Sequence, residues 1–177
     1  AALLAQADDD PRASGIVLHI DSGGGMSSAA ENLGHAIRQP AKPTLAYVDS
    51  FAASAALWAA AQCDQVQARP GSLVGSIGAY ITLREWTEYD REMGLELHLI
   101  SSGGTKGHGA GGWNISSDFK AELQQLVDES TAHFVAALAA GRQRPRGAMA
   151  ALATGQVWTA EHAQLLGLVD TVAHDLP

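Results

Sequence analysis

The hydrophobic residues of this chain follow two alternating patterns. Short apolar runs that end in glycine or polar residues predict buried strands. Longer segments with apolar residues at helical spacing, or rich in helix-favouring residues, predict helices. The predicted strands cover residues 15–20, 44–48, 65–68, 95–100 and 168–172, and the predicted helices cover residues 26–37, 52–62, 84–93, 116–138 and the segment between 159 and 167.

This alternation of strands and helices predicts an α/β fold with a mostly parallel sheet. The length of 177 residues fits one domain of ordinary size. No internal repeat or interdomain linker is visible. We therefore expect a lead-in over residues 1–14, partly disordered, followed by a single domain over residues 15–177.

Composition narrows the classes of function. Hydrophobic residues make up 46% of the chain, which is enough for a real core, and the net charge of -8 argues against a nucleic-acid-binding surface. The single cysteine, Cys63, allows neither an internal disulfide nor a cysteine metal cluster, and we expect it to be a buried thiol. No segment approaches the roughly 20 apolar residues of a membrane span. We expect no metal, no cofactor and no membrane span.

Three segments could carry chemistry. Gly23-Gly24-Gly25 lies between a strand and a helix, where it is either a tight turn or half of an oxyanion hole. It lacks the Gly-Lys-Ser/Thr ending of a phosphate loop. Ser54 opens an alanine-rich helix, where it is either a helix cap or a nucleophile whose own amide or that of Ala55 faces an oxyanion. Lys106 lies in a glycine-rich loop, as a solvated side chain or as a general base.

A lysine acts as a base only when it is neutral, and burial favours the neutral form of an amine. Such a lysine also needs a hydroxyl to orient it, and Ser76 and Thr105 are the candidates. A Ser-His-Asp triad is the rival arrangement, with His108 as the only histidine in a glycine-rich loop. Nothing resembles the H-E-x-x-H motif, so a zinc hydrolase is not expected.

From Gly15 to about Val172 the chain resembles the signal peptide peptidase A family of serine peptidases. Six segments that match motifs of this family occur in the family's order. They are Ile20–Gly25 (strand, then S-P-G-G), Lys42–Ala46 (K-P-V), Ala52–Ala56 (A-A-S-G-G), Gly75–Gly78 (G-S-I-G), Ser102–Lys106 (S-G-x-x-K) and Ala163–Asp170 (A-x-x-x-G-L-V-D). The resemblance implies a Clp-protease/crotonase-like fold, with a mostly parallel sheet and alternating helices.

The resemblance also implies a role for each matching residue. Ser54 is the nucleophile and Lys106 the general base, and Ser76 holds the lysine in place. The amides of Gly24 and Ala55 form the oxyanion hole. Two departures stand out: glycine replaces the proline of S-P-G-G, and alanines replace both glycines that follow the family's serine.

The implied activity is that of a serine endopeptidase acting through a Ser-Lys dyad and an acyl-enzyme. Its substrates are signal peptides in the cellular branch of the family, or scaffold and capsid proteins in the phage head-maturation branch (the protein C type). The sequence does not separate the two. The family also implies a homo-oligomer, and the alanine-rich surroundings of Ser54 suggest an apolar P1 pocket.

Two alternatives remain from other functional classes. The alanines after Ser54 are compatible with a non-catalytic assembly or scaffold protein that retains the peptidase fold. A crotonase-like acyl-CoA enzyme shares the oxyanion-hole geometry without the Ser-Lys pair.

Overall fold

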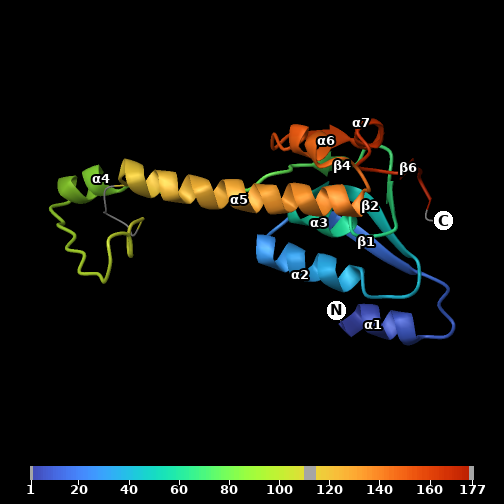
Figure 1. Cartoon of the computed structure of the whole chain (residues 1–177). Coiled ribbons are helices and arrows are strands. Elements are labelled where there is room, and N and C mark those ends of the chain that lie inside the picture. The colour runs from blue at the N-terminus through green and yellow to red at the C-terminus, as the bar shows by residue number, and fades with distance from the viewer. Residues whose placement is uncertain (1, 110–114, 176–177) are drawn as a thin grey trace. The chain divides into compact units, whose positions relative to one another are not determined.

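The computed structural model describes residues 2–109 and 115–175. The chain forms two compact units (Figure 1). Unit 1 contains the described residues up to Ala79 and from Ser130 onward, and unit 2 runs from Tyr80 to Glu129. No change of composition marks either boundary, and one helix continues through the second boundary. This division was therefore not apparent in the sequence.

The sheet of unit 1 is built around its longest strand, β2. Its strands are β1 (Ile16–Ser22), β2 (Thr44–Ala53), β3 (Gln65–Ala68), β4 (Leu73–Gly75), β5 (Val157–Thr159) and β6 (Thr171–Val172). Strand β1 pairs with β2, and the path through the rest of the sheet is β5-β4-β2-β3-β6. Only the β4–β5 pair is antiparallel. The predicted α/β fold with a mostly parallel sheet is confirmed.

Five helices lie wholly within the described residues of unit 1, and a sixth enters it. They are α1 (Ala2–Asp9), α2 (Ser27–Ile37), α3 (Ala55–Ala60), α6 (Arg146–Ala151), α7 (Ala160–Leu165) and α5 (Ser117–Gly141), the last from Ser130 onward. Helix α7 begins as the sequence predicts, because the Thr159 side chain accepts a hydrogen bond from the His162 amide. Helix α3 begins later than predicted, because β2 continues as far as Ala53.

The core contains many small residues, as expected from the alanine content. Val48, Ala52, Leu57 and Val66 are fully buried between the sheet and the helices. The rings of Trp58 and Phe134 stack with their centroids 5.1 Å apart, which joins α3 to α5. Close packing of this kind fixes the start of α3, where Ser54 lies.

The lead-in that we expected to be partly disordered is helical over Ala2–Asp9. The Asp8 carboxylate accepts hydrogen bonds from the amides of Ala41 and Lys42 at 3.0 Å, and these bonds lower the pKa of Asp8. The ammonium group of Lys42 donates to the carbonyls of Ala7 and Asp10. These contacts attach α1 to the segment that precedes β2.

Unit 2 contains α4 (Thr87–Glu92) and the first turns of α5. The strand predicted over residues 95–100 is wrong, since the described part of unit 2 contains no strand. Leu95 is 62% exposed and Ile100 is 97% exposed. The alternating pattern is present, but no neighbouring strand in this unit offers the hydrogen bonds that a sheet requires.

Candidate active site

Ser54 occupies a sharp turn between β2 and α3. Its backbone has φ 55° and ψ -125°, a conformation that costs a non-glycine residue about 1–3 kcal/mol. The Ser54 amide donates to the Gly75 carbonyl at 2.9 Å, and the Ser54 carbonyl accepts from the Trp58 amide at 3.0 Å. The turn is thus held from both sides. Because the Ser54 amide already donates to Gly75, the Ala55 amide is the remaining candidate of the two oxyanion donors that the sequence suggested.

Gly24 lies directly against this turn because of an irregular register between β1 and β2. Ile20 pairs with Val48, but Ser22 pairs with Ala52, so two extra residues of β2 lie between the two pairs. This shift brings Gly24 beside Ser54. A Cβ atom at Gly24 would lie 2.7 Å from the Ser54 Cβ and 2.9 Å from the Ala53 carbonyl oxygen, and the φ of Gly24 is +114°. Only glycine fits at this position without displacing its neighbours.

The amides of Gly24 and Ala55 are the two predicted oxyanion donors, and the structure brings them together. A Cβ at Gly24 would lie 3.1 Å from the Ala55 nitrogen. Ala55 is the first residue of α3, where amides lack an intrahelical partner, and its N–H has no acceptor among the described residues. The Gly24 amide donates to the Ser22 hydroxyl at 3.2 Å, a contact that the sequence analysis did not predict.

Ser76 lies next to Ser54 at the carboxyl ends of two paired strands. Ala53 pairs with Gly75 in the parallel β2–β4 ladder, so the two serines follow in register. Ser76 shares the positive φ of 55°, and its amide donates to the Gln156 carbonyl at 2.7 Å. Its predicted role, holding the lysine, stays a prediction.

Lys106 lies in unit 2, in an exposed turn. In this loop the His108 amide donates to the Thr105 carbonyl at 3.1 Å, and Gly107 packs closely against Leu99. The structure therefore brings together Ser54, Gly24, Ala55 and Ser76 within unit 1. The pairing of Ser54 with Lys106 stays a prediction.

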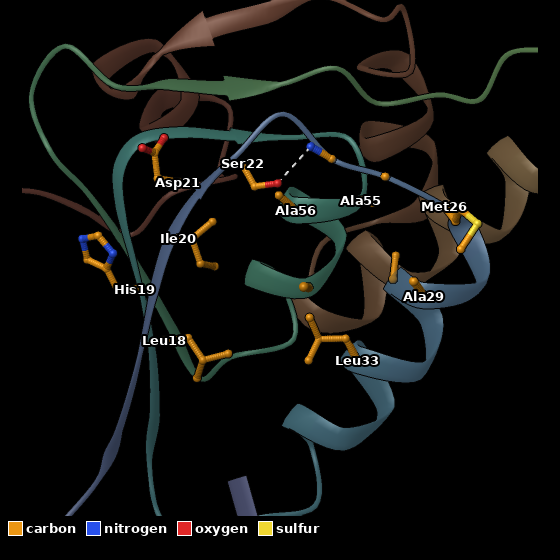
Figure 2. A pocket seen from close by; sticks show the side chains of 14 residues that line it. Leu18, His19, Ile20, Asp21, Ser22, Met26, Ala29, Leu33, Ala55 and Ala56 are labelled. Carbon is orange, nitrogen blue, oxygen red and sulfur yellow. Dashed lines mark hydrogen bonds between the residues drawn. The ribbon is translucent and has the colours of Figure 1, made fainter. Parts of the chain in front are cut away.

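An apolar cavity of about 450 Å³ adjoins the two oxyanion donors (Figure 2). Leu18 and Ile20 point from β1 toward α2 and α3, whereas His19 and Asp21 point to the other side of the strand (Figure 2). The turn of Ser22, Gly24 and Gly25 also lines the cavity, and residues of the two helices, with Met26 just before α2, complete the lining. These last residues are Met26, Ala29, Ala30, Leu33, Ala55, Ala56 and Ala59.

The histidine alternative rests on His108, which lies in unit 2 as Lys106 does, so it also stays a prediction. In unit 1, His19 is one of the residues that line the cavity, but its ring points to the other side of β1, where Nε2 lies 3.7 Å from an Asp49 carboxylate oxygen. No histidine lines the small hollow that Ser54 borders. The described residues also contain no cluster of histidine, cysteine, aspartate or glutamate that could hold a metal ion. None of their helices is long and apolar enough to cross a membrane.

Comparison with curated proteins finds relatives along most of the chain. A Methanocaldococcus jannaschii protein is 30% identical over 172 residues, which cover 96% of this chain and 55% of that protein. Protease 4 of Salmonella typhi is 28% identical over 92% of this chain and 27% of its own length. The head-tail preconnector protein of Enterobacteria phage P21 is 29% identical over 75% of this chain and 27% of its own length. The chain thus spans about half, or less, of these relatives.

Solved structures confirm the fold. A variant of the 1510-N membrane-bound stomatin-specific protease superposes with a TM-score of 0.65 at 17% identity, covering 99% of this chain and 71% of that one. A variant of ClpP1 from Listeria monocytogenes gives a TM-score of 0.60 at 9% identity, covering 98% and 85% of the two chains. The fold is therefore Clp-protease-like. The model of peptidase family S49 matches residues 36–174, which confirms the resemblance seen in the sequence motifs, and the chain belongs to this family.

Proposed function

We propose that this chain is the peptidase domain of a serine endopeptidase, with Ser54 as the nucleophile and Lys106 as the general base. The observation that carries the proposal is the turn at Ser54. A strained serine at the end of a buried strand lies beside two backbone amides, of Gly24 and Ala55, that can serve an oxyanion. A strand-to-helix turn of this kind exposes a nucleophilic hydroxyl while the sheet fixes its position.

The reaction is acyl transfer. The neutral amine of Lys106 takes the proton of the Ser54 hydroxyl, and the serine oxygen attacks the peptide carbonyl carbon. The amides of Gly24 and Ala55 donate to the developing oxyanion. The Gly24 amide must then leave the neutral Ser22 hydroxyl, to which it donates at 3.2 Å, and donate to the oxyanion instead. A hydrogen bond to a charged oxygen is the stronger of the two. Lys106 then protonates the leaving amine, and water hydrolyses the acyl-enzyme. Ser76, next to Ser54, orients the lysine.

The apolar cavity is the proposed P1 pocket. It borders Gly24 and Ala55, and the side chains of α2 and α3 that line it are alanine, leucine and methionine. The two alanines that follow Ser54 both line it, so their methyl groups narrow it relative to glycines. We infer a preference for small or aliphatic P1 side chains. Signal peptides and phage scaffold or capsid proteins are both candidate substrates of the assembled protein.

A serine-reactive fluorophosphonate probe tests the proposal. Labelling of the full chain, mapped to Ser54 by mass spectrometry, is the expected result. Ser54→Ala should abolish both labelling and peptide hydrolysis while the circular dichroism spectrum is unchanged, and Lys106→Ala should slow both by orders of magnitude. Absence of labelling in the assembled wild-type protein would contradict the assignment and favour the non-catalytic assembly protein.

A further inference from the structure

A second, much smaller hollow borders Ser54 directly. Its free volume is about 10 Å³, which is room for a single group of the size of a water molecule. It shares Gly25 and Ala55 with the lining of the apolar cavity, whereas Ser54 lines this hollow and not the apolar cavity. The nucleophile therefore adjoins a site that is too small for a substrate side chain.

Three hydroxyl groups line the hollow, namely those of Ser27, Ser54 and Ser130. Ser27 is the first residue of α2, and Ser130 lies in α5, 103 residues further along the chain. Their hydroxyl oxygens are 3.2 Å apart, so one donates a hydrogen bond to the other. Two distant elements thus place a hydroxyl pair beside the nucleophile.

Two buried aromatic residues form part of the remaining lining. The indole of Trp58 and the ring of Phe134 form part of the wall, and both residues are buried and stacked on each other. These rings offer no acceptor and prevent the hollow from widening. A bound molecule can take hydrogen bonds from the serine hydroxyls, and the Ala55 amide on the same lining offers a further donor.

The hydrogen-bonding capacity of the pair suits one water molecule. A serine hydroxyl has one donor and two lone pairs. When one of the two serines donates to the other, one O–H and several lone pairs remain available. Ser54 adds further capacity, so a water molecule finds the two to four partners that an ordered site requires.

We propose that this hollow holds the water molecule that hydrolyses the acyl-enzyme, and that Ser27 and Ser130 are its positioning residues. The proposal rests on the proposed function, because it needs an acyl group on Ser54. The water oxygen bonds to the acyl carbon while its proton passes to the neutral amine of the general base. The bond between the acyl carbon and the Ser54 oxygen then breaks, and the base returns the proton to that oxygen. The products are a carboxylic acid and free Ser54.

Holding the water beside the ester matters because orientation lowers the barrier of a bimolecular step. Deacylation needs this water, whereas acylation of Ser54 does not. Loss of the hydroxyl pair should therefore slow the second half-reaction and leave the first unchanged. A merely structural role of Ser27 and Ser130 would affect both half-reactions together.

The test uses the full chain and a p-nitrophenyl ester of an N-acylated alanine. The burst of p-nitrophenolate reports acylation, the later steady rate reports deacylation, and intact-mass spectrometry counts the acyl-enzyme. We expect Ser27→Ala and Ser130→Ala to keep the burst rate within twofold and to lower the steady rate by about 3- to 10-fold each, the effect of one lost hydrogen bond. Ser130→Val, which fills the hollow with methyl groups, should lower it further. Ser28→Ala, one residue from Ser27 and outside the lining, is the matched control.

Two results would overturn the inference alone. One is a normal burst with a wild-type steady rate in Ser27→Ala, Ser130→Ala and Ser130→Val. The other is an equal fall of the burst and the steady rate in these variants. If wild-type protein forms no acyl-enzyme at Ser54, the proposed function fails, and this inference fails with it.

Discussion

Substituting Gly24 by alanine tests the geometry on which the oxyanion hole depends. The added Cβ would lie 2.7 Å from the Ser54 Cβ and 2.9 Å from the Ala53 carbonyl oxygen, and both separations are too short for real contacts. The φ of +114° adds about 1–3 kcal/mol of strain for an alanine. Overpacking of a tight site typically costs about 1–3 kcal/mol more. We therefore expect Gly24→Ala to lower the free energy of unfolding by at least about 2 kcal/mol.

The same substitution should damage catalysis, since relief of the contact requires the Gly24 amide or the Ser54 turn to move. Displacing one oxyanion donor lowers kcat by about 10²- to 10³-fold. Urea-induced unfolding and kcat on a peptide substrate measure the two effects. Gly23→Ala is the matched control, because a Cβ there meets nothing within 4 Å, and it should change stability by less than about 0.5 kcal/mol. If Gly24→Ala matches Gly23→Ala in both measurements, the packing described here is wrong.

Three further predictions concern the base, the pocket and the thiol. Activity should rise with pH as the general base loses its proton, and a rate that falls steadily from pH 6 to 9 in folded protein would argue against Lys106. Ala29→Phe, on the α2 side of the apolar cavity, should lower kcat/KM for peptides with leucine at P1 about 10-fold more than it lowers kcat/KM for peptides with alanine at P1. A peptide library that shows a preference for charged P1 residues would contradict an apolar pocket. Burial raises the pKa of Cys63 to about 12, so iodoacetamide at pH 8 should modify the unfolded but not the native chain. As the pH rises, the thiol of the unfolded chain ionises before the buried thiol does. The contribution of Cys63 to the free energy of unfolding should therefore disappear between pH 9 and about 12. In Cys63→Ala, the free energy of unfolding should lack this pH-dependent loss.

Local patterns were sufficient for several elements of unit 1. The strand predicted over residues 65–68 coincides with β3, and α2 and α7 lie within the helical segments predicted over residues 26–37 and between 159 and 167. Four elements escaped prediction, namely α1, β4, β5 and α6. Strand β5 has three residues and exists only because it pairs with β4, more than eighty residues earlier, which no local pattern reports. The segment 95–100 shows the reverse, because it has the residue pattern of a strand but no strand with which to pair among the described residues of unit 2.

The motifs located the candidate site, but the sequence could not show how its parts meet. Gly24 and Ser54 lie 30 positions apart, and their contact depends on the register shift between Ile20 and Ser22 along β1. The sequence likewise left open whether Ser54 or Ala55 supplies the second oxyanion donor. The Gly75 carbonyl accepts from the Ser54 amide, which leaves the Ala55 amide as the donor that we propose. Ser22 lies within the motif Ile20–Gly25, but the sequence did not predict that its hydroxyl accepts a hydrogen bond from the Gly24 amide, because this contact depends on the folded turn.

The strain at the site is maintained by the sheet that surrounds it. Ser54 and Ser76 both adopt φ 55°, and each would relax if its backbone were free. The Ser54 amide is bonded to the Gly75 carbonyl, and the Ser76 amide is bonded to the Gln156 carbonyl, so each strained turn is fixed by the next strand toward the sheet edge. The short strand β5 therefore supports β4, and through β4 the turn at Ser54. A change that detaches β5 from β4 should loosen Ser76 first and Ser54 through Gly75, and so reduce activity at a distance from the reacting atoms.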